Sequence, residues 1–254
     1  DYDFDSCRHF SDLRDPHDIG AEAARRAASR TGARQMKTGE ATVIFEPRVS
    51  RGLVSHLAGA VNGMSVARKT SFLRKNRGDA IFGRDVSIVD EPHLLRGVAS
   101  RPFDAEGILA DDLWLVKDGV LHNWFLDSAT AKQLGMETNA RANRAGSGTS
   151  PGSTNLTMLP GSRRPEEMIA DTKHGILVTE LIGQGVSLVT GDYSRGASGF
   201  LIENGEVTHP VSEITIAGNL RDMFERLEPA NDLDKRFGTN APTIAVEGMT
   251  IAGS

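Results

Sequence analysis

Seven histidines and one cysteine are the residues of this sequence whose side chains are best suited to hold a transition metal ion. A metal clamp on a single helix or strand needs two such ligands a few residues apart. No two histidines are spaced two to five residues apart; they are His9, His17, His56, His93, His122, His174 and His209. The sequence therefore contains no local histidine clamp. With Cys7 as its single cysteine, the chain can form no internal disulfide, which is typical of a reducing compartment.

Motifs for phosphate binding and for a nucleophilic serine are absent as well. No segment matches the P-loop pattern GxxxxGK followed by Ser or Thr, or the GxSxG turn of serine hydrolases. Gly183-Gln184-Gly185 begins like a dinucleotide-binding fingerprint, but Leu188 stands where the third glycine is needed. A Ser–His–Asp site assembled from distant segments stays open, although no pattern points to one.

The segment 183–199 is unusually rich in glycine, with five glycines in seventeen residues between two strand-like segments. Glycine in or between strands marks a bulge or a close backbone approach, either to another strand or to a ligand. Two interpretations are equally compatible with this pattern. The segment is either a tightly turned connection between strands or part of the wall of a groove.

The elements that position these residues can be predicted from hydrophobic spacing and turn chemistry. Val49, Leu53, Leu57 and Ala60 recur at helical spacing, which makes His56 an ordinary residue of an amphipathic helix. Another helix is expected between Asp15, as its N-cap, and Gly32. This helix is expected to dock on the protein surface through an apolar stripe of Ile19, Ala23 and Ala27.

Two hairpins are predicted at Asp118-Gly119 and Asn204-Gly205, flanked by strands at 113–117 and 120–125 and at 199–203 and 206–209. Further strands are expected near 41–46, 86–90, 156–159, 176–182, 211–217, 243–247 and 249–252. Helices are expected near 165–174, with His174 at the C-terminal end, and near 219–227. Strands outnumber helices and tight turns join them. We therefore predict an α+β fold, with a mainly antiparallel, barrel-like β-sheet core and several flanking helices.

Composition restricts the class of protein further. The 254 residues are 39% hydrophobic and 25% charged, as in ordinary globular domains, and the net charge of −5 provides no basic field for nucleic acid. No apolar stretch approaches the roughly 20 residues that span a bilayer. The chain opens on Asp1 without an initiating Met, so we expect it to be a fragment. The run 140–153, rich in Gly, Pro, Ser and Thr, is expected to be a flexible loop, either a surface linker or a flap over a groove.

Several longer runs resemble the TldD/PmbA family, and specifically its PmbA (TldE) branch. They are GDYSRGASGFLIENGE at 191–206, IAGNL at 216–220, SRPFD at 100–104, TELIGQG at 179–185 and GMTIAG at 248–253. The resemblance covers nearly the whole chain. It implies that residues 1–254 form the C-terminal domain of the family and that its N-terminal domain is absent from this chain.

The resemblance also implies an activity. The family is described as cytoplasmic bacterial proteases built from two homologous subunits, TldD and PmbA/TldE, and also as modulators of DNA gyrase. The TldD branch carries a zinc-binding helix with the pattern His-Glu-x-x-Gly-His and a late cysteine ligand. In this chain the aligned residues are Ser55-His56-Leu57-Ala58-Gly59-Ala60. The glycine is retained, whereas the two histidine positions are Ser55 and Ala60 and the general-base position is His56.

This departure matters because catalytic zinc needs about three protein ligands and a bound water. We therefore expect no catalytic residue, metal or other cofactor in this chain, and expect zinc in a TldD-type partner. The resemblance implies a heterodimer with that homologous subunit, or a self-dimer, that acts on unfolded peptides. The chain would contribute dimer surface and part of the channel wall, without contact to nucleic acid or membrane. Candidate peptide contacts are Asp192, Tyr193, Ser194 and Arg195, which could equally stabilise a turn.

Two alternatives come from other functional classes. The chain could be an active hydrolase with an unrecognised site that uses His56 or His93. It could instead be a regulatory module that binds a gyrase-associated partner without proteolysis.

Overall fold

The computed structural model describes the backbone of residues 1–254 and every side chain except that of Ala145. Its helices are the 3₁₀ helix η1 (Phe10–Asp12) and α1 (Pro16–Ser29), α2 (Pro47–Ala60), α3 (Gly63–Ala67), α4 (Ser128–Leu134), α5 (Pro165–Asp171) and α6 (Leu220–Arg226). Its strands are β1 (Gly39–Phe45), β2 (Ile88–Asp90), β3 (Leu113–Lys117), β4 (Val120–Leu121), β5 (Ala142–Ala145), β6 (Gly148–Pro151), β7 (Leu156–Met158), β8 (His174–Ile182), β9 (Asp192–Glu203), β10 (Glu206–Asn219), β11 (Leu227–Pro229), β12 (Thr239–Asn240) and β13 (Ile244–Ala252).

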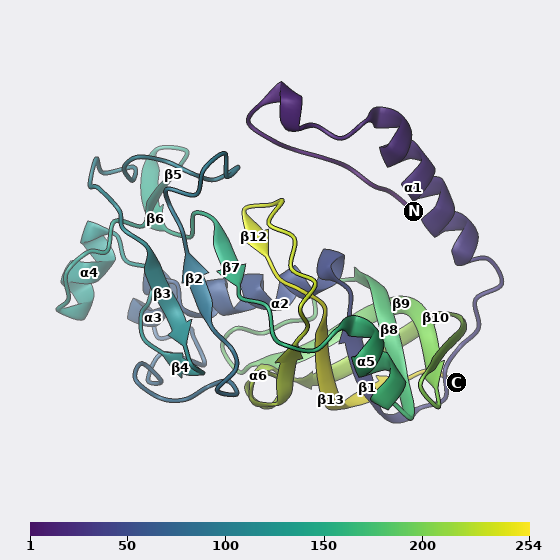
Figure 1. The fold of residues 1–254 in the computed structure, drawn as a ribbon. Helices are drawn as coiled ribbons and strands as arrows, with labels where there is room; N and C mark the ends of the chain where they lie inside the picture. Colours follow the sequence, from purple (N-terminus) through teal and green to yellow (C-terminus); the bar gives the residue numbers. More distant parts are fainter.

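Five strands close into a barrel in the order β1-β8-β9-β10-β13, because β13 pairs back onto β1 (Figure 1). The closing pair is antiparallel and runs from Gly39 opposite Ile251 to Phe45 opposite Ile244. β1 and β8 are parallel, every other pair in the barrel is antiparallel, and β11 extends the sheet beside β13. The predicted α+β fold with a mainly antiparallel, barrel-like core is confirmed.

Helix α2 lies between this barrel and a second sheet of order β12-β7-β2-β3-β4 (Figure 1). One side of the helix is buried through Leu53, Val54, Leu57 and Ala60. These side chains belong to a single apolar cluster that extends into both sheets. The barrel and the second sheet thus hold α2 from two sides, as the apolar spacing of its sequence requires.

The two predicted hairpin turns are present. Asp118-Gly119 joins β3 to β4 and Asn204-Gly205 joins β9 to β10, and all four residues have the positive φ of a type I′ turn. The second hairpin is longer than predicted, since β9 and β10 continue to Asp192 and Asn219.

Three predicted elements differ from the structure. The helix expected to reach His174 ends at Asp171, because His174 begins β8 and pairs with Glu203 of β9. Residues 122–125 form no strand, since the chain leaves the sheet after Leu121 and the Phe125 N–H bonds to Val61 at the end of α2. The two strands expected near 243–247 and 249–252 are one strand, β13.

The segment 140–153 contains the hairpin β5–β6, with Ala142 opposite Pro151. Its backbone is therefore largely paired, which a glycine-rich and serine-rich composition did not indicate. Its mobility stays a prediction.

Residues 1–14, which we call the N-terminal strap, arch with α1 over the face of the molecule that carries α2 and β12 (Figure 1). Asp15 caps α1 as predicted, but the expected apolar docking of this helix is wrong, because α1 contains no buried residue. Ion pairs hold the strap instead: Asp3 binds Arg14 and Arg26, and Asp5 binds Arg236. Within the described residues, no helix has the length and apolar character needed to cross a membrane.

A buried ion pair joins β2 to the segment before β5. Arg141 Nε lies 2.6 Å from Asp90 Oδ2, and both side chains are inaccessible to solvent. Thr154 donates two further hydrogen bonds to the Asp90 carboxylate, and Arg141 donates to the Asp111 carbonyl oxygen. Every charged atom of the pair is thereby satisfied inside the protein, as a buried pair requires.

Replacing Arg141 with Met should lower the free energy of unfolding by roughly 3–5 kcal/mol, because it leaves the carboxylate of Asp90 buried without its cation. Urea denaturation measures this change. The matched control is Arg164→Met, which removes an exposed pair with Glu167 and should leave the midpoint nearly unchanged. Equal effects of the two substitutions would contradict the importance of the buried pair.

Candidate functional site

The three motif positions on α2 face different surroundings. Ser55 is exposed, and its hydroxyl donates to the Arg51 carbonyl oxygen at 3.0 Å. Ala60 is 0% exposed and lies in the core. Residues five apart on a regular helix lie about 140° apart around its axis, and α2 is helical from Pro47 through Ala60. The two positions that correspond to zinc ligands therefore point away from each other.

His56 packs against a buried tyrosine. Its ring centroid lies 6.0 Å from that of Tyr193, in an edge-to-face arrangement with an interplanar angle of 75°. Burial lowers the pKa of His56, and the positive charge of Arg195 lowers it further. Burial also raises the pKa of Tyr193 far above its usual value. Both rings are neutral near pH 7, so the contact is a packing pair rather than an ionised dyad.

The glycine retained from the zinc motif has a packing role. A Cβ at Gly59 would lie 2.7 Å from Cδ1 of Leu188, which belongs to the glycine-rich segment. Leu188 in turn packs against the main apolar cluster. The end of the Leu188 side chain thus fills the space beside Gly59, and brings the 183–191 segment against α2.

The glycine-rich segment makes a close backbone approach to β9 as well. The Ser194 N–H donates to the Gly185 carbonyl oxygen at 2.7 Å, and a Cβ at Gly185 would lie 2.0 Å from the Ser194 carbonyl oxygen. Of the two interpretations left open, these contacts support a tightly turned connection for this part of the segment.

The four candidate peptide contacts divide between two faces of β9, as alternation along a strand requires. Tyr193 is buried against α2 and Arg195 is half-buried on the same face, whereas Asp192 and Ser194 are exposed on the other. The Asp192 carboxylate accepts from the Thr190 hydroxyl at 2.6 Å. Asp192 therefore stabilises the turn before β9, and the structure does not bring all four side chains to one site.

Arg195 and Ser55 both line one hollow of about 500 Å³, which lies between α2 and the end of β8. We call this the α2 hollow. Its wall includes Thr179 and Leu181 of β8 and, from the strap, Tyr2. Arg51, one turn before Ser55, also lines it and carries a second guanidinium. Arg51 was not identified from the sequence. Its spacing of four residues from Ser55 predicts that the two are neighbours on the helix, but no sequence pattern indicates that they share a hollow with Arg195.

The donor atoms available on α2 do not fit a zinc ion. The motif positions offer an exposed hydroxyl, a methyl group and one imidazole that packs on Tyr193. Across the described side chains, no group of three or more His, Cys, Asp or Glu residues could hold a metal. Cys7 lies in the strap, where its thiol donates to the His9 carbonyl oxygen, and a ring nitrogen of His93 lies 2.6 Å from the Ala110 carbonyl oxygen.

Replacing Arg195 with Gln should raise the pKa of His56 towards 6.5, because one of the two causes that lower it is removed. An NMR titration of the histidine Cε1 protons measures this pKa, with Arg74→Gln, an exposed arginine that does not line the α2 hollow, as the control. Because the pKa of His56 is lower in the folded than in the unfolded protein, protonation of His56 favours unfolding. The contribution of His56 to the free energy of unfolding is therefore highest above pH 6.5 and decreases as the pH falls through the folded-state pKa. An unchanged His56 pKa in Arg195→Gln would contradict the electrostatic contact.

Comparisons with known proteins identify the family to which this architecture is similar. Residues 38–253 match the family model of the PmbA/TldA metallopeptidase C-terminal domain. The metalloprotease PmbA of Escherichia coli O157:H7 is 42% identical over 254 residues, which are 100% of this chain and 55% of that protein. A metalloprotease PmbA homolog of Haemophilus influenzae is 39% identical over 256 residues, again with 100% and 55% coverage. The chain thus spans about half the length of these curated relatives.

Solved structures agree with this assignment. A Bacteroides thetaiotaomicron protein described as a modulator of DNA gyrase has a TM-score of 0.88 at 32% identity, covering 98% of this chain and 55% of that one. TldE from Thermococcus kodakarensis has a TM-score of 0.82 at 24% identity, covering 93% and 55%, and so shares the fold. Together with the family model and the 42% identity, these findings show that the chain belongs to the PmbA/TldD metallopeptidase family.

Proposed function

We propose that this chain acts as the non-catalytic, PmbA/TldE-type part of a cytoplasmic metallopeptidase that degrades or trims unfolded peptides. A homologous TldD-type subunit would supply the zinc, or, in a self-dimer, a second copy would complete the channel. One observation carries the proposal. Ser55 and Ala60, at the positions of the family's two histidine ligands, have no ligating side chain and point in different directions.

The contribution of this chain would be a peptide surface beside α2. β8 pairs with β1 only through Gly175–Val178, so its last residues, 179–182, have a strand partner only on the β9 side. An unpaired strand edge can accept an extended peptide through backbone hydrogen bonds, which give affinity without much sequence preference. This edge borders the α2 hollow, where Leu181 and Arg195 meet.

The alternative of an active hydrolase has less support from the geometry. His56 packs on Tyr193, and a ring nitrogen of His93 lies 2.6 Å from the Ala110 carbonyl oxygen, so neither ring is bonded to a nucleophilic side chain. The alternative of a regulatory module that binds a gyrase-associated partner is supported only by names: two structural neighbours are described as modulators of DNA gyrase.

A cleavage assay separates these functions. The full-length protein that contains this chain should leave an unfolded peptide intact on its own, and chelator-sensitive cleavage should appear when a TldD-type subunit is added. His56→Ala should retain at least half of the cleavage rate of the pair, because the imidazole is assigned a packing role. Circular dichroism checks that the variant is folded.

Chelator-sensitive cleavage by the lone protein would contradict the proposal. Loss of cleavage in a folded His56→Ala variant would favour the hydrolase alternative. Capture of gyrase without a homologous subunit and without any cleavage would favour the regulatory one.

A further inference from the structure

The α2 hollow contains two guanidinium groups that lack a carboxylate partner. Among the described residues, neither Arg51 nor Arg195 forms an ion pair. The other charged residues that line the hollow are paired: Arg48 binds Asp1 at 2.6 Å and Glu46 at 3.0 Å, and Glu180 binds Arg30 at 2.8 Å. The hollow therefore carries an excess of two positive charges, although the whole chain is acidic.

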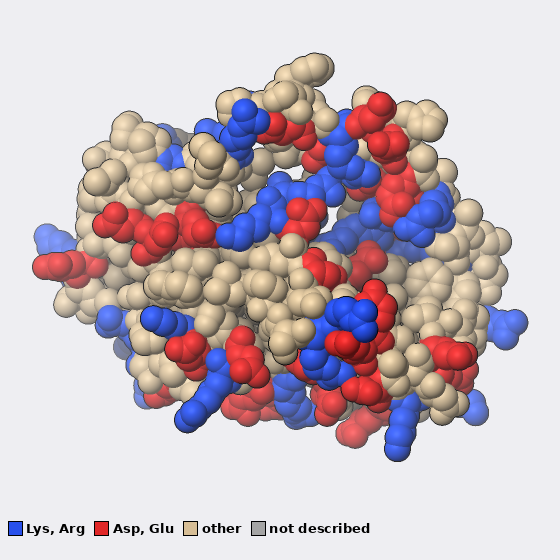
Figure 2. Space-filling model, viewed as in Figure 1, with Lys and Arg blue, Asp and Glu red and all other residues tan. Residues whose placement is uncertain are grey.

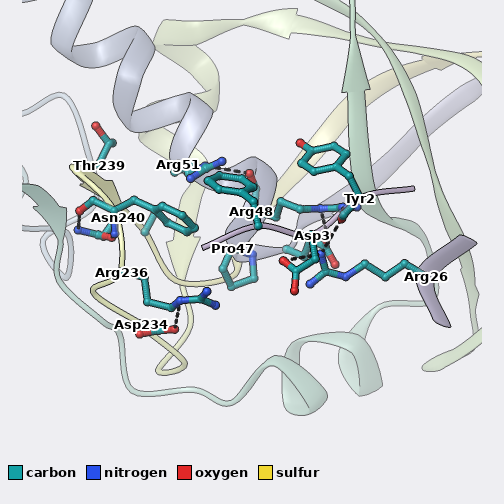
Figure 3. A pocket seen from close by; sticks show the side chains of 14 residues that line it. Tyr2, Asp3, Arg26, Pro47, Arg48, Arg51, Asp234, Arg236, Thr239 and Asn240 are labelled. Carbon is teal, nitrogen blue, oxygen red and sulfur yellow. Dashed lines mark hydrogen bonds and ion pairs between the residues drawn. The ribbon is translucent and has the colours of Figure 1, made fainter. Parts of the chain in front are cut away.

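Arg51 is held in place from several sides. Its guanidinium carbon lies 4.2 Å from the ring centroid of Phe237 and 5.8 Å from that of Phe4. Its Nε donates to the Arg48 carbonyl oxygen at 3.2 Å, and its two terminal nitrogens have no acceptor within the part of the chain that the structure describes. Burial lowers the pKa of Arg51, which shows that its environment disfavours an uncompensated cation. A second hollow lies beside the α2 hollow and shares Tyr2, Arg48 and Arg51 with it. Figure 3 shows Arg51 next to Arg48 in this second hollow.

Arg195 is fixed in a similar way at the opposite wall. Its Nε donates to the carbonyl oxygen of Ile182, the last residue of β8, at 3.2 Å, and its terminal nitrogens have no acceptor among the described residues. A guanidinium with two free terminal nitrogens is well suited to bind a carboxylate through charge-assisted hydrogen bonds. Both arginines thus offer the same chemistry to one cavity.

We propose that the α2 hollow is a binding site for a peptide carboxylate, held by Arg51 and Arg195. Its volume of about 500 Å³ is that of a site for a few residues. Besides charge, the wall supplies the aromatic ring of Phe237 and the edge of β8 at Leu181, beyond Thr179, whose carbonyl oxygen already accepts from Arg48 at 2.7 Å. This proposal deepens the proposed function, since it names the peptide chemistry that the same surface selects.

The N-terminal strap shows that this face of the molecule accepts an acidic, aromatic chain. Its first five residues alternate Asp1, Tyr2, Asp3, Phe4, Asp5. Asp1 binds Arg48 of α2 and Asp5 binds Arg236, whereas Asp3 binds Arg14 of the strap and Arg26 of α1. Tyr2 lies over the Arg48 guanidinium at 5.3 Å, and Phe4 contacts the ring of Phe237. Figure 2 shows blue side chains lining the depression beneath the strap. The strap contacts Arg51 only through the ring of Phe4, and none of its carboxylates pairs with Arg51 or Arg195 among the described residues, which leaves both guanidinium groups for a second carboxylate.

Fluorescence anisotropy with the full-length protein tests the site. The probe is a fluorescein-labelled Gly-Leu-Ala-Gly-Leu-Ala peptide with a free C-terminal carboxylate. It is compared with the C-terminal amide and with an amide in which one Ala is replaced by Asp. The free carboxylate should bind at least tenfold more tightly than the plain amide, and the preference should weaken at high salt. Tight binding of the Asp-containing amide would assign the site to side-chain carboxylates, and weak binding would assign it to C-terminal ones.

Arg195→Gln should abolish the tenfold preference, and Arg51→Gln should reduce it similarly, whereas the control Arg74→Gln should keep it. Since Arg51 also packs on Phe237, Arg195→Gln decides the outcome if Arg51→Gln does not fold. Equal binding of all three peptides, or an unchanged preference in folded Arg195→Gln, would overturn the proposal. Because binding is measured without a partner, failure here leaves the cleavage result of the pair intact.

Discussion

The burial of one face of α2 between two sheets is the constraint on which the site depends. Leu53, Leu57 and Ala60 must face the shared core, since the barrel and the second sheet both pack on this helix. At about 100° per residue, the same helix then turns Ser55 outward. The helix therefore presents its outer face to a polar hollow and keeps its inner face apolar, and the two motif positions, Ser55 and Ala60, lie on different faces and carry no histidine.

Under the proposed function, this division lets the family scaffold bind a peptide without holding a metal. In this chain the two ligand positions carry Ser55 and Ala60, whereas the helix, its contact with Leu188 at Gly59 and the neighbouring strand edge are all present. The arginines beside that edge supply positive charge without any need for a metal. The proposed function assigns this chain the binding and orientation of a peptide, and assigns the hydrolytic step to its partner.

Local chemistry predicted much of the fold, and long-range contacts account for what it missed. The turns at Asp118-Gly119 and Asn204-Gly205 and the apolar spacing of α2 are properties of a few adjacent residues, and they were predicted correctly. His174 was misassigned because its strand pairing with Glu203 depends on residues far along the chain. For the same reason, sequence could not predict the ion pair of Asp90 with Arg141, or that Arg51 has no such partner among the described side chains.

The zinc content of the purified full-length protein tests the central claim most directly. After dialysis against zinc and gel filtration, elemental analysis should find far less than one zinc per chain, and His56→Ala should not change that value. One tightly bound zinc per chain, lost in His56→Ala, would contradict the account, because it would mean that α2 assembles a metal site from residues that point apart in this structure.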